Sequence, residues 1–143
     1  MDKRQTEDPR KKGDLAEKLF EIECIKRDIP IYTPVNSATR DDYVVVIDDE
    51  FKKVQIKYIS MTGDGKVCVS FAKPQNGRSA DKTLKYTEDE IDLFFVYCPD
   101  LDEWYNIPIS LARENRTVAL RDPSYKPKNN QTKGVRYTTD FKW

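Results

Sequence analysis

The sequence predicts an α/β fold with a central mixed β-sheet flanked by helices, and three observations support it. Residues 44–47 and 93–98 are short apolar runs rich in β-branched and aromatic side chains, as in strands buried on both faces. Residues 15–25 instead space their apolar side chains as a helix does. A chain of 143 residues is long enough for one domain with its own core. We therefore expect the first helix on one sheet face and shorter helices on the other.

The first helix is expected to begin at Asp14 and to stop near Asp28, before Pro30. Asp14 is a suitable N-cap, and Glu17 follows three residues later as in a capping box. The apolar stripe would consist of Leu15, Leu19, Ile22 and Ile25, widened by Phe20 and Cys24. Residues 1–12 are highly charged, include Pro9 and have no apolar period, so they predict a flexible arm.

The central feature is a β-hairpin, in which residues 44–47 and 53–58 flank an acidic turn at 48–50. Side chains alternate along a strand, so Val54 and Ile56 would face one way and Gln55 and Lys57 the other. Asp42 stands at the edge of the first strand. An acid placed beside a Gln and a Lys on one strand face can hold a divalent cation and a phosphate.

The rest of the chain predicts further strands and a docked tail. A turn at Gly63-Asp64-Gly65 precedes a third strand at 67–71, and residues 93–98 would pair with 103–109. A short helix at 110–114 and an edge strand at 117–120 follow. We divide the chain into the arm (1–12), a core (13–122) and a basic tail (123–143). Apolar residues near the chain end predict that the tail docks on the core or on a neighbouring subunit.

Composition excludes several classes of protein. The chain has no histidine and no Cys-x-x-Cys pair, which argues against zinc sites and histidine-based catalysis. No apolar run approaches the roughly 20 residues of a membrane span. The three cysteines lie far apart in apolar company, so we expect buried free thiols and a reducing, cytoplasmic location.

Net charge is zero, but residues 51–86 carry an excess of lysine and arginine. Nucleic acid would therefore be contacted through local patches. Cations in and near the basic loop could follow a phosphate backbone, although a solvated loop is the simpler interpretation. These candidates for DNA binding are Lys66, Lys73, Arg78, Lys82 and Lys85.

The hairpin residues form a recognisable set for phosphodiester hydrolysis. Asp42, the Gln55 side-chain oxygen and the Ile56 carbonyl offer hard oxygen ligands for Mg²⁺. Lys57 could orient or activate the attacking water and offset charge on the phosphate. Glu17 has two interpretations: a first-turn acid favoured by the helix dipole, or a carboxylate leaning toward Asp42 and the metal. The structural alternative for the whole set is a solvated strand face, because this residue spacing is common by chance.

Short motifs along most of the chain resemble one nuclease family. Residues 13–17 (GDLAE) resemble a G-x-x-A-E helix opening, and Pro34, Asp42 and residues 54–57 (VQIK) resemble a P…D…V-Q-V-K core. Residues 91–109 are similar to an I-D-x-F-x-V-Y-x-P…Y-x-I-P-I segment, and residues 129–137 resemble the same branch's C-terminal tail. The chain thus resembles the PD-(D/E)XK endonucleases, in the Gln-x-Lys branch that contains group I intron-associated homing endonucleases.

The resemblance implies a restriction-endonuclease-like core that cuts double-stranded DNA with Mg²⁺, or Mn²⁺ as a substitute, as a homo-oligomer. It assigns metal binding to Asp42 and Gln55, the attacking water to Lys57, and support of the metal or its waters to Glu17. Asp41 competes with Asp42 as the ligand, and the spacing from Pro34 favours Asp42. Tyr43 occupies a usually aliphatic position. A Holliday-junction resolvase, a restriction-like nuclease and a non-catalytic DNA-binding protein remain as alternatives.

Overall fold

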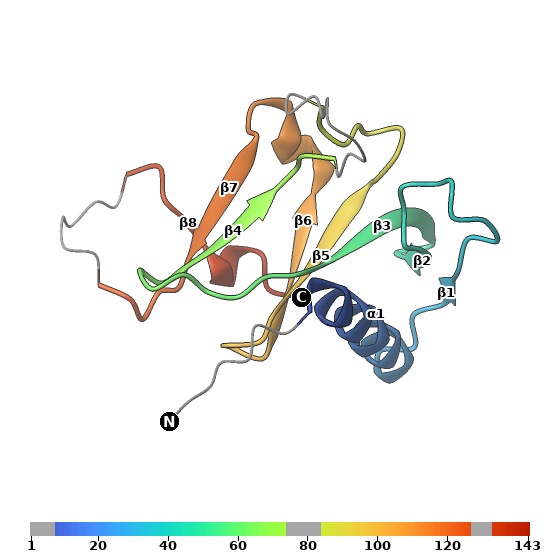
Figure 1. The fold of residues 1–143 in the computed structure, drawn as a ribbon, viewed down its shortest axis with the longest axis horizontal. Helices are drawn as coiled ribbons and strands as arrows, with labels where there is room; N and C mark the ends of the chain where they lie inside the picture. Colours follow the sequence, from blue (N-terminus) through green and yellow to red (C-terminus); the bar gives the residue numbers. More distant parts are fainter. Residues whose placement is uncertain (1–7, 74–83, 127–132) are drawn as a thin grey trace.

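The computed structural model describes residues 8–73, 84–126 and 133–143 (Figure 1). In these ranges the chain forms one α-helix, eight strands and two 3₁₀ helices. The elements are α1 (Pro9–Lys26), β1 (Ile31–Tyr32), β2 (Tyr43–Ile47), β3 (Glu50–Tyr58), β4 (Lys66–Ser70), β5 (Leu93–Cys98), β6 (Glu103–Pro108), η1 (Ile109–Arg113), β7 (Thr117–Arg121), β8 (Arg136–Tyr137) and η2 (Thr138–Asp140). The predicted α/β class is confirmed.

The central sheet is mixed, with the strand order β1-β2-β3-β5-β6. Its β3 and β5 strands run parallel, whereas the other neighbours are antiparallel. The predicted hairpin is confirmed as β2 and β3, and Asp48 and Asp49 turn the chain with φ angles of 52° and 61°. Two successive left-handed residues match the right-handed twist of the flanking strands. Of the two runs expected to be buried on both faces, β5 is buried on both, whereas β2 is buried mainly on one.

Helix α1 begins earlier than the sequence predicted. Its N-cap is Asp8, whose side chain accepts a hydrogen bond of 3.0 Å from the Arg10 backbone N–H. Pro9 occupies the first helical turn, where its missing N–H costs nothing and its fixed φ favours the helix. Asp14 is therefore not the N-cap, and residues 9–12 belong to the helix. The remainder of the predicted arm, residues 1–7, lies outside the described residues. The predicted stop is confirmed, since α1 ends at Lys26.

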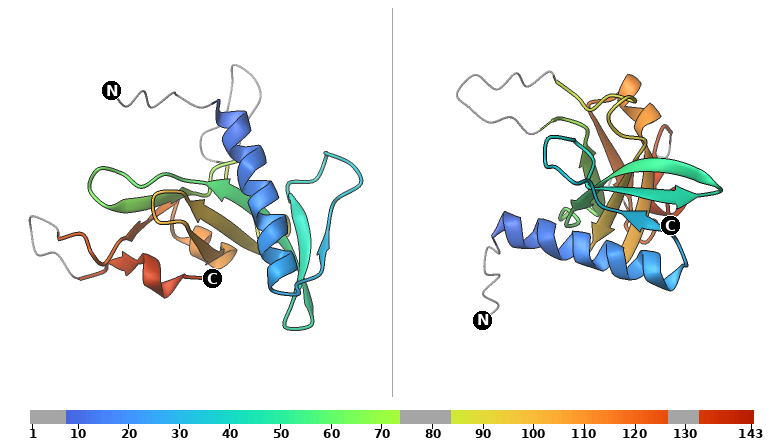
Figure 2. Two further views of the ribbon diagram at one scale, coloured as in Figure 1. Left: turned by 90° about the horizontal axis from the view of Figure 1, so that it is seen from below. Right: turned by 90° about the vertical axis from the view of Figure 1, so that its right-hand side faces the viewer.

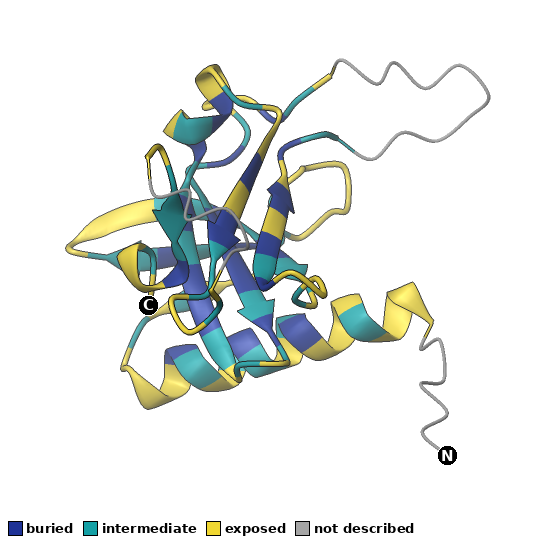
Figure 3. Ribbon diagram, turned by 90° about the vertical axis from the view of Figure 1, so that its left-hand side faces the viewer, coloured by how far each residue is buried: buried dark blue, intermediate teal, exposed yellow. Residues whose placement is uncertain are grey.

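The helix packs against one face of the central sheet through Ala16, Phe20 and Cys24, which are fully buried (Figures 2 and 3). These residues are spaced by four and so lie on one side of a helix. The predicted stripe is wrong in part, because Leu15, Ile22 and Ile25 are exposed and only Leu19 packs partly on this core. Cys24 and Cys98 are buried free thiols as expected, but Cys68 is exposed.

The other face of the central sheet is covered by a second, three-stranded sheet of order β4-β7-β8 and not by the shorter helices that we expected (Figure 1). The third predicted strand is β4 of this sheet, and β7 is its middle strand instead of an edge. The reason is that buried and exposed side chains alternate along β4 and β7. The buried set packs against β5 and β6 and consists of Val67, Val69, Val118 and Leu120.

The end of the chain packs on the domain. The Trp143 ring lies 4.6 Å from the Phe95 ring centroid, and the Arg27 guanidinium lies 4.0 Å from the Trp143 centroid. Arg27 Nη2 also donates a hydrogen bond of 2.9 Å to the Trp143 carbonyl. These contacts join the last residue to the C-terminal end of α1. In the described part of the chain, no helix combines the length and apolar character that a membrane crossing requires.

Candidate active site

The Asp42 carboxylate contacts Gln55 and the backbone of Ile56 on the neighbouring strand. Asp42 immediately precedes β2, and its backbone N–H donates to the Val54 carbonyl at 2.8 Å. Its Oδ2 accepts hydrogen bonds from Gln55 Nε2 at 2.7 Å and from the Ile56 backbone N–H at 2.8 Å. Asp41 instead lines a separate surface hollow with Lys53. Asp42 is therefore the carboxylate joined to the β3 residues.

Lys57 lies on the same face of β3 as Gln55, above an aromatic floor. Its Nζ is 5.4 Å from the Phe94 ring centroid and 6.0 Å from that of Tyr86. Burial lowers the pKa of Lys57, and the negative charge of Asp42 partly opposes this. A lysine held in this way is a more effective proton acceptor than one in water. Tyr86 belongs to no motif, and nothing in the sequence marked it as a neighbour of Lys57.

Glu17 is electrostatically coupled to Asp42. Burial raises the pKa of Glu17, and the charge of Asp42 raises it further. Burial likewise raises the pKa of Asp42, whereas the hydrogen bond from the Ile56 N–H lowers it. Glu17 is not in the first turn of α1, which contains no acid, so the interpretation as a dipole-stabilised first-turn acid is wrong. The coupling agrees with the alternative in which Glu17 leans toward Asp42.

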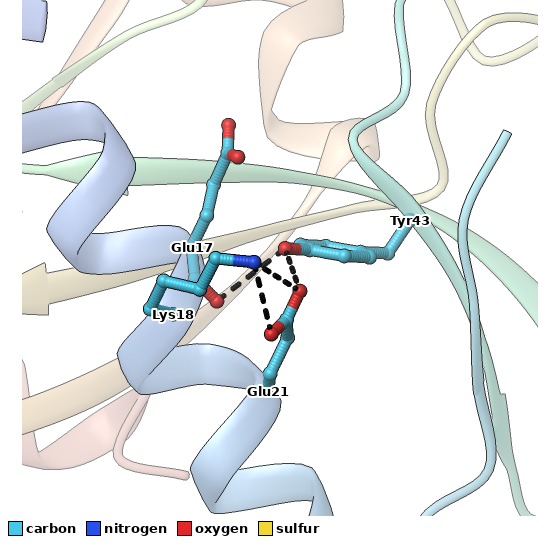
Figure 4. Close-up of polar contacts among 4 residues, drawn as sticks. All are labelled: Glu17, Lys18, Glu21 and Tyr43. Atoms are coloured by element: carbon cyan, nitrogen blue, oxygen red, sulfur yellow. Dashed lines mark hydrogen bonds and ion pairs between the residues drawn. The ribbon is translucent and has the colours of Figure 1, made fainter. Parts of the chain in front are cut away.

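A polar contact between α1 and β2 holds the helix that carries Glu17 (Figure 4). The Tyr43 hydroxyl donates to Glu21 Oε1 at 2.8 Å and lies 3.5 Å from the Glu17 carbonyl oxygen. Lys18 pairs with the same Glu21 carboxylate at 3.3 Å. The Glu17 carboxylate points away from this contact (Figure 4). Tyr43 thus links α1 to β2 without a hydrogen bond to the Glu17 carboxylate.

The donor set suits a hard divalent cation. The charge of Asp42 acts on both Glu17 and Lys57, and two carboxylates against one lysine give these three residues an excess of negative charge that a cation would offset. Gln55 donates to Asp42 through its nitrogen, which leaves its side-chain oxygen as an acceptor. No group of three or more His, Cys, Asp or Glu side chains with metal-binding geometry occurs among the described residues. A metal here would accordingly need the Gln55 amide and the Ile56 carbonyl besides the carboxylates.

A groove of about 420 Å³ opens beside Lys57. It is lined by Pro9, Lys12 and Gly13 of α1, by Lys57, Tyr58 and Ile59 of β3 and its end, and by Cys68 and Ser70 of β4. Gly13 lies inside a helix, where alanine would be about 1 kcal/mol more favourable. A Cβ at Gly13 would meet no atom within 4 Å, so glycine is not needed here to avoid a clash. The missing side chain leaves the groove wider at this point. Of the candidate site residues, Lys57 lines this hollow and Asp42, Gln55, Ile56 and Glu17 do not; we refer to it as the active-site groove because of Lys57.

Two of the predicted DNA-binding cations have partners within the domain. Lys73 pairs with Glu90 at 2.7 Å with both side chains mostly covered, and Lys85 Nζ donates to the Ala112 carbonyl. Lys66 pairs with Asp64 at 3.1 Å in a more exposed position. Arg78 and Lys82 lie outside the described residues. Of the described candidates, Lys66 is the one best placed to contact a ligand.

Two comparisons found proteins that are similar to this chain. A family model described as PD-(D/E)XK endonuclease matches residues 7–143. The chain belongs to the PD-(D/E)XK endonuclease family. This PD-(D/E)XK chain is also similar to a solved structure described as a bacterial homing endonuclease, I-Ssp6803I, with a TM-score of 0.73 and 16% identity. The similarity covers 93% of this chain and 87% of the other and shows a shared fold. Among curated proteins, no sequence matches.

Proposed function

We propose that this PD-(D/E)XK endonuclease is a magnesium-dependent enzyme of the homing type that hydrolyses phosphodiester bonds in double-stranded DNA. The observation that carries the proposal is the contact of Asp42 with Gln55 and Ile56. Lys57 lies on the same face of β3 as Gln55 and lines the active-site groove. The structural neighbour described as a homing endonuclease supports the choice of type.

Each residue of the site has a distinct role in the proposal. Asp42, the Gln55 side-chain oxygen and the Ile56 carbonyl hold Mg²⁺ or Mn²⁺, and Glu17 supports the metal or its waters. Lewis-acid polarisation of the scissile phosphate is the chemistry that the bound ion supplies. Lys57 orients the attacking water and accepts its proton when the amine is neutral, which its lowered pKa favours. As an ammonium, the same group offsets charge that develops on the phosphate.

We also propose that the enzyme acts as a homo-oligomer. One compact domain of 143 residues spans too little DNA to define a rare site, whereas a symmetric pair reads two half-sites. Leu15, Ile22 and Ile25 leave apolar side chains exposed on α1, with exposed fractions of 47%, 47% and 72%. These side chains support an additional contact at this helix.

The test is cleavage of a supercoiled plasmid and of a synthetic four-way junction, each with and without Mg²⁺. Wild type is compared with Lys57→Met and with Lys52→Met, a control on the same strand whose lysine pairs with Glu50 at the surface. We expect magnesium-dependent plasmid cleavage that falls about 10²- to 10⁴-fold in Lys57→Met and stays unchanged in Lys52→Met.

Preferential cutting of the junction would instead assign the chain to the resolvases. Binding without cutting, on a library of random duplexes that includes rare sites, would contradict catalysis and favour a DNA-binding role.

A further inference from the structure

The outward face of the second sheet connects the active-site groove to a separate basic pocket. In β4, Val67 and Val69 face the core, so Lys66, Cys68 and Ser70 face outward. In β7, Val118 and Leu120 face the core, and the register pairs Lys66 with Arg121 and Cys68 with Ala119. Cys68 and Ser70 line the groove beside Lys57, whereas Lys66 lies at the opposite end of β4. One face of one strand therefore joins two hollows.

The basic pocket has a volume of about 170 Å³. It is lined by Lys66, Ala119, Arg121, Lys133, Gly134, Val135 and Arg136. Four of these described lining residues are cations and none is acidic, although the whole chain carries equal numbers of acids and bases. Lys66 pairs with Asp64, but both side chains are exposed, at 37% and 55%, and such surface pairs contribute little. The pocket therefore offers concentrated positive charge to an anion.

The two hollows are spaced for one stretch of nucleic-acid backbone. The four residue steps from Lys66 to Ser70, at about 3.4 Å each, span roughly 14 Å. Duplex DNA carries one backbone charge per roughly 1.7 Å of helix axis, so several phosphates of its two strands fall within a span of this size. Cys68 of the groove pairs in register with Ala119 of the basic pocket, and both outward side chains are small, which allows a duplex to approach the sheet.

We propose that the basic pocket binds a backbone phosphate of the same DNA duplex whose scissile phosphate lies in the active-site groove. The pocket contributes affinity and sets the register of the duplex without taking part in the chemistry. This assignment rests on the proposed function, because the groove must hold DNA for the pocket to hold its neighbouring phosphates.

The test uses the full chain with Lys133→Ala and Arg136→Ala combined, against a control that combines Lys26→Ala with Arg113→Ala. The control removes the same charge from exposed residues that pair with Glu23 and Glu88 and do not line the pocket. The dissociation constant for a short duplex is measured over a salt series without Mg²⁺, so that the duplex stays intact. Each lost phosphate contact reduces the slope of log K against log salt by about 0.9.

We expect the slope to fall by roughly 0.9 in the pocket variant, which corresponds to about 8-fold weaker binding at 0.1 M salt. The control should keep both the wild-type slope and the wild-type cleavage rate. A single Lys133→Glu change at this exposed residue, expected to weaken binding further than Lys133→Ala, guards against misfolding of the double variant.

Two results would overturn the assignment in distinguishable ways. If wild type cuts DNA but the pocket variant keeps the wild-type slope, the pocket assignment fails and the proposed function stands. If wild type neither binds nor cuts any duplex, both fail together.

Discussion

Replacing Tyr43 with phenylalanine removes one hydroxyl from the contact that joins β2 to α1 (Figure 4). Tyr43 is only 4% exposed and its hydroxyl is 2.8 Å from Glu21 Oε1. Burial and the hydrogen bond to Glu21 raise the pKa of Tyr43, so the hydroxyl remains a donor at every pH of interest. The variant thus deletes one donor to a carboxylate and leaves the ring in place.

The expected loss follows from the surroundings of Glu21. A hydrogen bond to a charged group contributes about 1.5–3 kcal/mol to stability. The Glu21 side chain is 33% exposed and keeps Lys18 as a partner, so we expect the lower end, about 1.5 kcal/mol. For a chain of this length, that loss lowers the Tm by roughly 5 °C. Because α1 carries Glu17, the half-maximal magnesium concentration for cleavage should rise as well.

The assay is urea unfolding of wild type, Tyr43→Phe, Glu21→Gln and the double variant, which together form a double-mutant cycle. Tyr32→Phe, at a tyrosine that is 54% exposed, serves as the control and should change stability by less than about 0.5 kcal/mol. Equal stability of Tyr43→Phe and wild type, or a coupling energy near zero between Tyr43 and Glu21, would refute the reasoning.

Three further predictions follow from the burial of charged and thiol groups. Asp42→Asn should unfold at a higher temperature than wild type at pH 7 without metal, because the raised pKa of Asp42 means that its charged form, present above the folded pKa, destabilises the fold. Mg²⁺ should raise the Tm of wild type but not that of Asp42→Asn, and an increase in the variant would place the metal elsewhere. Lys57 has a lowered pKa, so wild-type stability should rise as pH increases from the folded pKa to 10.5, and Lys57→Met should lack this rise in a pH series of urea unfolding. A bulky thiol reagent should modify the exposed Cys68 before the buried Cys24, because burial raises the pKa of Cys24 to about 12. Modification of Cys68 should block DNA cleavage, since Cys68 lines the active-site groove. Cys68→Ser should stay active after treatment, and inhibition of that variant would contradict the position of the groove.

The sequence was sufficient for the central hairpin and for the residues that it brings together. A valine-rich run, an acidic turn and an alternating strand define a local register, and this register places Gln55 and Lys57 on one face beside Asp42. The contact between Asp42 and the Ile56 N–H follows from the same register. Such contacts are predictable because they depend on neighbours within about fifteen residues of one another.

The features that were missed depend on distant partners or on an ambiguous residue. Pro9 resembled a helix breaker, but proline is also favoured in the first helical turn, and only Asp8 as N-cap distinguishes the two. The pairing of β4 with β7 joins Lys66 to Arg121, and no local pattern specifies that partner. The exposure of Cys68 was available from the sequence, since Val67 and Val69 on either side of it mark the opposite face as buried.

The most direct test of the central claim compares two neighbouring carboxylates. Cleavage of duplex DNA under single-turnover conditions is measured over a magnesium series for Asp42→Asn and Asp41→Asn. Asp42 contacts Gln55 and Ile56, whereas Asp41 lines a separate hollow. We predict at least about a 100-fold loss of rate in Asp42→Asn, because the metal's contribution is several kcal/mol, and near wild-type cleavage in Asp41→Asn. Equal rates in the two variants, or a greater loss in Asp41→Asn, would contradict the assignment of the active site to Asp42, Gln55 and Lys57.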